Sequence, residues 1–106
     1  MRTYELRAYT LSSWEALDSY RTVNYPRHLT SFAHHDIGLH GLWTAQDGSP
    51  VLYALVSYAE GKDSEKVAEQ FMSSAEFRAD VEGFDPSTIV YVTTTLLEPS
   101  AGSPLL

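Results

Sequence analysis

Four stretches of the chain alternate between hydrophobic and polar positions, or are apolar throughout, over lengths typical of β-strands. We predict strands over residues 2–11, 39–46, 51–58 and 88–97. In the first strand, Glu5, Arg7 and Tyr9 share one face. The third strand is apolar at both parities, which indicates burial on both of its faces. Asp47-Gly48, between the second and third strands, is a strong signal for a hairpin turn.

The second predicted strand carries chemically different side chains on its two faces. Strict alternation places Leu39, Gly41 and Trp43 on one face. It places His40 and Leu42 on the other face. We therefore expect His40 and Trp43 to point in opposite directions from this strand.

Two segments between the strands have apolar residues three and four positions apart, as amphipathic helices do. The first begins after a cap at Ser12 or Ser13 and breaks near residues 23–25, ahead of Pro26. Pro26 then opens a second helical piece that stops at Gly38. The other segment follows a cap at Asp63 or Ser64, reaches Met72, and after Ser73 or Ser74 continues as a short turn through Val81.

The order of these elements, βαββαβ, predicts an α+β fold of the ferredoxin-like type with a four-stranded antiparallel sheet. We expect residues 1–98 to form one domain and residues 99–106 an extended tail that packs through Leu105 and Leu106. Two helical segments cover only one face of such a sheet. The third and fourth strands are apolar on both faces, so we predict a homodimer in which two open sheet faces pack together.

The composition argues against several kinds of function. The chain has no cysteine, and its net charge of −7 opposes binding to nucleic acid. The first residues lack the apolar core of a signal peptide, and the longest apolar run, residues 51–56, is too short to span a membrane. We expect a cytoplasmic protein that binds neither nucleic acid nor membranes.

Several motifs resemble those of the NIPSNAP family, whose members belong to the dimeric α+β barrel superfamily. They are the opening Tyr-Glu-Leu-Arg-Ala-Tyr-Thr-Leu at 4–11, His-Gly-Leu-Trp-Thr at 40–44, the Asp-Gly turn at 47–48 and Ser-Pro at 103–104. Tyr-Pro-Arg-His at 25–28 and Ser-Ala-Glu-Phe at 74–77 resemble a bacterial subgroup. The resemblance implies a dimeric α+β barrel with a small-molecule pocket between the sheet and helices of each subunit. It implies no single activity.

All four histidines lie between Asn24 and Trp43, and histidine is the side chain best suited to acid–base chemistry near neutral pH. We predict three catalytic residues, His28, His40 and Tyr25, and four substrate-binding residues, Arg7, Trp14, Phe32 and Trp43. Burial beside Phe32 should lower the pKa of His28 and leave a neutral base. The alternatives are that each histidine is a buried structural residue and that Arg7 pairs with Glu5 or with a carboxylate across the dimer.

Metal binding has weak support in the sequence. His34 and His35 diverge by about 100° on a helix, while His28 and His35 lie about 10 Å apart along one. His34, His35, Asp36 and His40 would approach one ion only if the helix ends at Asp36. We predict no metal and no cofactor.

Three functions remain open for a small-molecule pocket of this kind. The first is a cofactor-free isomerase or cyclase of secondary metabolism, acting on a hydrophobic, carbonyl-bearing, polyketide-like compound through histidine acid–base catalysis. The second is a cofactor-free monooxygenase. The third is a binding or interaction module without catalysis.

Overall fold

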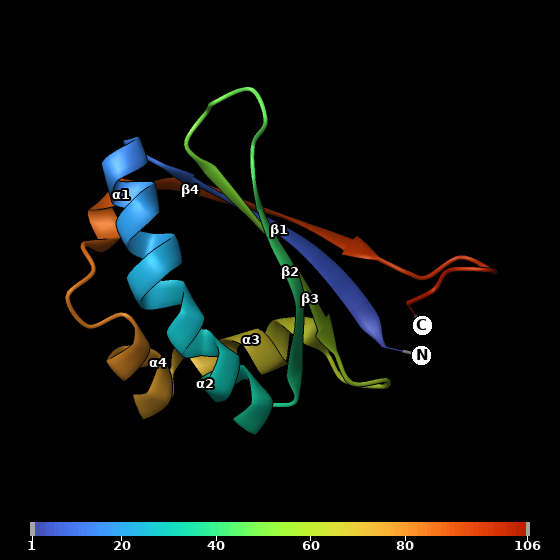
Figure 1. The fold of residues 1–106 in the computed structure, drawn as a ribbon. Helices are drawn as coiled ribbons and strands as arrows, with labels where there is room; N and C mark the ends of the chain where they lie inside the picture. The colour runs from blue at the N-terminus through green and yellow to red at the C-terminus, as the bar shows by residue number, and fades with distance from the viewer. Residues whose placement is uncertain (1, 106) are drawn as a thin grey trace.

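The computed structural model describes residues 2–105 and contains the predicted order of strands and helices (Figure 1). The strands are β1 (Thr3–Leu11), β2 (Ile37–Thr44), β3 (Val51–Tyr58) and β4 (Ile89–Leu97). The helices are α1 (Trp14–Ser19), α2 (His28–His34), α3 (Ser64–Met72) and α4 (Ala75–Asp80). Shorter turns are η1 (Tyr20–Asn24), η2 (Tyr25–Arg27) and η3 (Pro86–Thr88).

The four strands form one antiparallel sheet in the order β2-β3-β1-β4, which confirms the ferredoxin-like α+β fold. The helices cover one face of the sheet (Figure 1). Alternate residues of β1 and β3 point toward them and join helix side chains in a core that includes Tyr9, Leu11, Leu17, Phe32, Leu52, Val56 and Phe71. Each fully buried large apolar side chain stabilises the fold by about 1.5–3 kcal/mol.

The predicted helix break before Pro26 is wrong, because the chain keeps a helical path through the proline (Figure 1). Backbone angles stay helical from Ser19 to His28, and the helix widens into one π-turn, in which the Tyr25 N–H bonds to the Tyr20 carbonyl. Pro26 has no N–H to donate and its ring needs space in the preceding turn. The widened turn supplies that space, so α1 and α2 form one continuous, bent helical segment.

The helical segment formed by α1 and α2 ends earlier than predicted, at His34. Asp36, two residues before the predicted stop at Gly38, adopts a left-handed conformation (φ 55°), and β2 begins immediately afterwards at Ile37. Aspartate tolerates this conformation better than most residues. Gly38 is needed for another reason: a Cβ there would lie 2.6 Å from Ser57 Oγ on the neighbouring strand.

The predicted alternation along β2 is also wrong beyond Leu39, because a bulge interrupts the register between Leu39 and Gly41. Leu39 and Leu42 both pair with residues that face the helices, whereas Gly41 and Trp43 face the open side. A Cβ on Gly41 would lie 2.5 Å from Trp43 Cη2, so the indole lies directly over the glycine. The extra residue, His40, also lies on the open side, beside Ser57.

Helices α3 and α4 begin at two of the predicted caps. Asp63 accepts hydrogen bonds from the backbone of Glu65 and Lys66, and Ser74 accepts one from Phe77. Such caps each stabilise a helix by about 1 kcal/mol. The Ser74 cap fixes where α4 begins, and therefore where its last residue, Asp80, lies.

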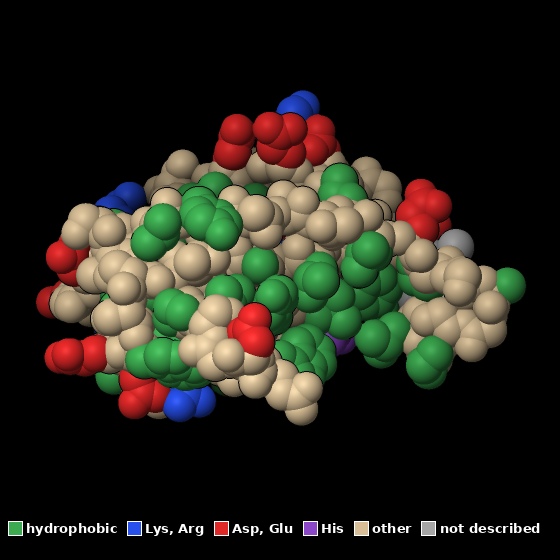
Figure 2. All heavy atoms as spheres, turned by 90° about the horizontal axis from the view of Figure 1, so that it is seen from above, with side chains coloured by type: hydrophobic (Ala, Val, Ile, Leu, Met, Phe, Trp, Pro, Cys, Tyr) green, Lys and Arg blue, Asp and Glu red, His purple; other side chains and the backbone are tan. Residues whose placement is uncertain are grey.

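Apolar side chains remain exposed on the open sheet face and along the edge strand β4. Tyr53 and Leu55 of β3 are half-buried there. In a single chain, therefore, only the helix-facing side of β3 is fully buried, whereas we expected burial of both faces. All of β4 beyond Ile89 is exposed. Figure 2 shows a side of the molecule on which hydrophobic side chains gather, while most of the Asp and Glu side chains in view lie near its outline.

The C-terminal tail projects past the end of the sheet (Figure 1). Leu105 is 42% exposed, so its predicted packing against the body is absent in the single chain, while packing against a partner stays a prediction. Leu106 lies outside the described residues. Among residues 2–105, no helix has the length and apolar character needed to cross a bilayer.

Candidate functional site

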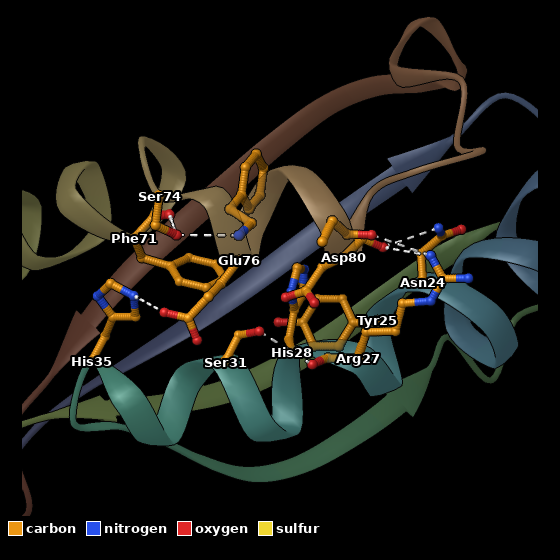
Figure 3. Close-up of polar contacts among 12 residues, drawn as sticks. Asn24, Tyr25, Arg27, His28, Ser31, His35, Phe71, Ser74, Glu76 and Asp80 are labelled. Carbon is orange, nitrogen blue, oxygen red and sulfur yellow. Dashed lines mark hydrogen bonds and ion pairs between the residues drawn. The ribbon is translucent and has the colours of Figure 1, made fainter.

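His28 and Asp80 form a buried pair where α2 meets α4 (Figure 3). His28 Nδ1 lies 2.8 Å from Asp80 Oδ2, and the two residues are 3% and 7% exposed. A carboxylate beside Nδ1 holds the proton on that nitrogen and leaves Nε2 as the acceptor. Within residues 2–105, the hydrogen bond of this imidazole is the one through Nδ1, and none is formed by Nε2. The pair therefore has the arrangement of an oriented general base.

Aromatic rings enclose the imidazole of His28. Phe32 stacks on it at a centroid distance of 5.1 Å, and Phe77 lies parallel on the other side at 6.0 Å. Tyr25 and Phe71 approach it edge-on at 4.9 and 5.3 Å. This burial lowers the pKa of His28 below its ordinary value, although Asp80 acts to raise it. The histidine is therefore neutral at pH 7, as predicted.

Asp80 is held in place through the backbone around it. Asn24 donates from Nδ2 to the carbonyls of Asp80 and Glu82 at 3.2 and 3.3 Å. Arg27 donates from Nη1 to the carbonyls of Ala79, Asp80 and Glu82 (Figure 3). The last carbonyls of a helix lack partners within the helix. The irregular turns η1 and η2 thus supply a side-chain cap to α4 and fix the carboxylate beside His28.

A cavity of about 190 Å³ lies between the sheet and the helices, in the region that the family resemblance implied. Arg7 and His28 lie in its wall. Half of the other lining residues are aromatic, namely Tyr9, Tyr20, Phe32, Tyr58, Phe71 and Phe77. Met72 of α3 and Val92 of β4 also line it and are partly exposed, which places them at its mouth. Few polar groups in an apolar wall are typical of small-molecule sites.

A chain of hydrogen bonds crosses the sheet side of the cavity. The Tyr58 hydroxyl donates to Glu5 Oε1 at 2.9 Å, and Arg7 Nη1 donates to the same oxygen at 2.8 Å. Arg7 Nε donates to the Tyr9 hydroxyl at 2.7 Å, which lies 3.3 Å from the Tyr25 hydroxyl. This network holds the guanidinium rigidly and leaves Nη2 without a hydrogen-bond partner among residues 2–105.

The structure brings together some of the predicted site residues. Arg7, His28 and Phe32 line one cavity. Tyr25 is fully buried beneath it, and burial together with Tyr9 raises its pKa well above the ordinary value. Tyr25 therefore stays protonated and supports the ring of His28 without lining the cavity.

The structure places His40 away from this cavity, contrary to our expectation, because the bulge in β2 directs it to the open sheet face. There His40 Nε2 lies 2.7 Å from Ser57 Oγ, which also accepts from Arg2 Nε at 2.7 Å. The ring of Tyr4 packs against His40. Partial burial and the nearby Arg2 lower the pKa of His40.

Neither tryptophan lines the cavity. Trp14 donates its indole N–H to the Gly48 carbonyl in the hairpin and is 41% exposed. Trp43 covers Gly41 on the open face and is 53% exposed. Their predicted role as cavity walls is taken by phenylalanines of α3 and α4.

His34 and His35 both approach the carboxylate of Glu76, which joins the end of α2 to α4. Asp36 pairs with Arg2. Over the described part of the chain, no three His, Asp or Glu side chains are arranged to hold a metal ion.

Sequence reasoning missed Asp80, and it named Glu5 only as a possible structural partner of Arg7, a pair that the structure contains. Asp80 lies in an acidic stretch whose other carboxylates are not buried. Its negative charge therefore did not distinguish it from its neighbours in the sequence. A usable signal was its position three residues after Phe77, on the same helix face. Glu5 alternates with Arg7 and Tyr9 on one strand face, and that pattern was visible from the start.

Comparison with known proteins places the chain among relatives of the same fold. No curated protein matches its sequence. A NIPSNAP family protein of unknown function from Agrobacterium tumefaciens shares 18% identity over 99% of this chain and 94% of that one, with a TM-score of 0.79. An uncharacterized NIPSNAP domain protein from Burkholderia xenovorans shares 18% identity over 96% and 98%, with a TM-score of 0.70.

A further similar structure comes from Caulobacter crescentus, a protein named for a proposed role as an antibiotic biosynthesis monooxygenase. It shares 13% identity over 93% of this chain and 91% of that one, with a TM-score of 0.65. Identities this low show a shared fold and no more. The NIPSNAP family model matches residues 4–104, nearly the whole sequence. The chain therefore belongs to the NIPSNAP family.

Proposed function

We propose that this protein is a small-molecule enzyme in which His28, oriented by Asp80, removes a proton from a carbon next to a carbonyl group. The observation that supports this most strongly is the buried His28–Asp80 pair in the wall of an apolar cavity, with Nε2 lacking any partner among residues 2–105. Because burial lowers the pKa of His28, the base is in its active, neutral form at physiological pH.

Arg7 supplies the second group that such a reaction needs. Proton removal moves negative charge onto the carbonyl oxygen, and a fixed N–H donor directed at that oxygen stabilises the charge as it develops. Arg7 lines the same cavity as His28 and is near enough to act on the pKa of its imidazole. The surrounding rings exclude water, which strengthens this interaction.

The overall reaction proposed first is isomerisation or cyclisation of a polyketide-like compound, because both begin with a carbanion next to a carbonyl and need no cofactor. A cofactor-free monooxygenase reaction is the second candidate. It is supported by the fold shared with the Caulobacter crescentus protein, and the same base would generate a carbanion that reacts with oxygen.

The test follows proton removal directly. Phenylacetone in D₂O carries a slowly exchanging proton next to its carbonyl, and ¹H NMR measures its replacement by deuterium. We expect the protein to accelerate exchange and His28→Gln to lose about 10²-fold or more of that acceleration. An oxygen electrode in the same solution separates the two candidate reactions, since only the second consumes oxygen.

His40→Gln is the matched control, because His40 lies on the opposite face of the sheet. This variant should accelerate deuterium exchange of phenylacetone as much as the wild-type protein does. If phenylacetone binds in the cavity but the wild-type protein does not accelerate exchange, the protein is a binding module and the proposal of an enzyme is wrong.

A further inference from the structure

We propose that this cavity selects a neutral carbonyl compound over an anionic one, and that Glu5 is the residue that sets this selectivity. The inference rests on the proposed function, since it concerns the ligand of the same cavity. A pocket with an arginine in its wall is ordinarily expected to take a carboxylate or phosphate. The surroundings of Arg7 point the other way.

Glu5 already neutralises Arg7 inside the fold. The two side chains are 11% and 20% exposed, with Arg7 Nη1 2.8 Å from Glu5 Oε1. The same carboxylate oxygen accepts a second hydrogen bond from Tyr58. Glu5 thus accepts from two donors and is fixed in its ion pair, so Arg7 presents little unbalanced charge to a ligand.

Several N–H groups of Arg7 remain for the ligand. Nε donates to Tyr9 and one N–H of Nη1 donates to Glu5, whereas Nη2 donates to no group among residues 2–105. A free N–H of Nη2 suits one carbonyl oxygen. Of the two forks by which arginine grips a carboxylate with paired contacts, the one formed by Nε and Nη2 already has its Nε engaged by Tyr9.

The other ionisable groups at the cavity add to this preference. His28 is neutral at pH 7, and Asp80 places a second carboxylate behind it. The site thus holds one positive and two negative side chains. Arg27 lies near Asp80 but is exposed, so solvent screens it. A carboxylate ligand would lose its hydration and bring a third negative charge, which burial makes costly.

The volume and the walls describe the rest of the ligand. A dry cavity of about 150 Å³ holds a benzene molecule, so the present 190 Å³ suits one ring with a short substituent. The aromatic walls favour a flat, conjugated body, since rings pack well edge-on and offset. The ligand class is therefore a neutral aromatic or conjugated ketone or aldehyde. Longer substituents would extend out of the cavity between Met72 and Val92.

Two probes of similar size test the selectivity on the intact wild-type protein. Acetophenone carries a neutral carbonyl, and benzoate carries a carboxylate on the same ring. We expect ¹⁵N–¹H spectra to show both perturbing cavity residues, with a Kd for acetophenone at least about tenfold lower than for benzoate.

Glu5→Gln removes one negative charge with little change of shape. It should lower the Kd for benzoate by about tenfold and leave acetophenone within about threefold of wild type. Asp80→Asn removes the second carboxylate and serves as an independent variant if Glu5→Gln does not fold. Glu15→Gln, on the exposed face of α1, is the control and should change neither Kd.

The possible results separate the two proposals. Benzoate binding as tightly as acetophenone to the wild-type protein, or no gain for benzoate in the folded Glu5→Gln or Asp80→Asn variant, overturns the charge selectivity and leaves the proposed reaction standing. Absence of cavity perturbation by either probe would overturn both, since neither can hold without ligand entry.

Discussion

The neighbours of His28 have opposing effects on the pKa of its imidazole. Four aromatic rings favour the neutral imidazole, while Asp80 favours the charged one. Burial prevails and the pKa falls. The same carboxylate that raises the pKa also holds the ring in one orientation, so the fold obtains a fixed base that is not protonated at pH 7.

This balance makes the stability of the protein depend on pH in a defined direction. In the unfolded chain the pKa of histidine is about 6.5, and in the fold that of His28 is lower. Above about pH 7.5 both states are largely neutral at this residue, so His28 contributes little pH dependence there. As the pH falls through 6.5 toward the folded value, the unfolded chain takes up a proton first, and the free energy of unfolding decreases.

Urea unfolding of the wild-type protein and His28→Gln at a series of pH values measures this contribution. The variant should lose less stability than the wild type between about pH 7.5 and pH 5, because glutamine does not titrate. Parallel curves for the two proteins over that range would show that His28 does not carry the effect.

Asp80 and His40 show why the site could be predicted only in part. The position of His28 and its burial followed from Pro26 and Phe32, which the sequence displays. Asp80 was not distinguished from its acidic neighbours, because its spacing from Phe77 only suggests a shared helix face and its burial depends on how α4 docks on α2. His40 was assigned to the wrong face because strict alternation cannot anticipate a bulge.

At the scale of elements, the irregular turns between α1 and α2 join the two halves of the chain. Strand order and helix caps were predictable because periodicity and turn residues are local signals. The π-turn was not, since it depends on how the helix accommodates Pro26. Its consequence is that Asn24 and Arg27 reach the end of α4, which lies more than fifty residues later in the sequence.

Asn24→Ala tests this connection. Asn24 is 2% exposed and bonds the carbonyls of Asp80 and Glu82, so its loss removes two hydrogen bonds from the end of α4 and leaves these carbonyls to Arg27. We expect the free energy of unfolding to fall by about 1–3 kcal/mol. The pKa of His28, followed by NMR, should fall further as Asp80 becomes less well held. Thr22→Ala, at an exposed position of the same turn, should leave that pKa unchanged.

At the scale of the whole molecule, the open sheet face and the edge of β4 are left with exposed apolar side chains. Surfaces of this kind mark interfaces, and an unpaired edge strand favours further pairing. We propose that two chains associate through this face, as the sequence predicted.

Sedimentation or light scattering at micromolar concentration should therefore give the mass of two chains. Leu55→Asp places a charge on the open face and should produce monomers, because the charge would be buried in the dimer. Leu29→Asp, on the exposed side of α2, is the matched control and should remain dimeric. A wild-type mass of one chain would contradict the proposal.

The bulge in β2 has a consequence for how related chains are aligned. Leu39, Gly41, Leu42 and Trp43 would occupy the same faces of a regular strand if His40 were absent, because the bulge adds one residue without changing the pairing around it. His40 is thus an insertion in the geometric sense. A relative one residue shorter at this point keeps the same interior and the same exterior, and a gap placed at His40 marks no change of architecture.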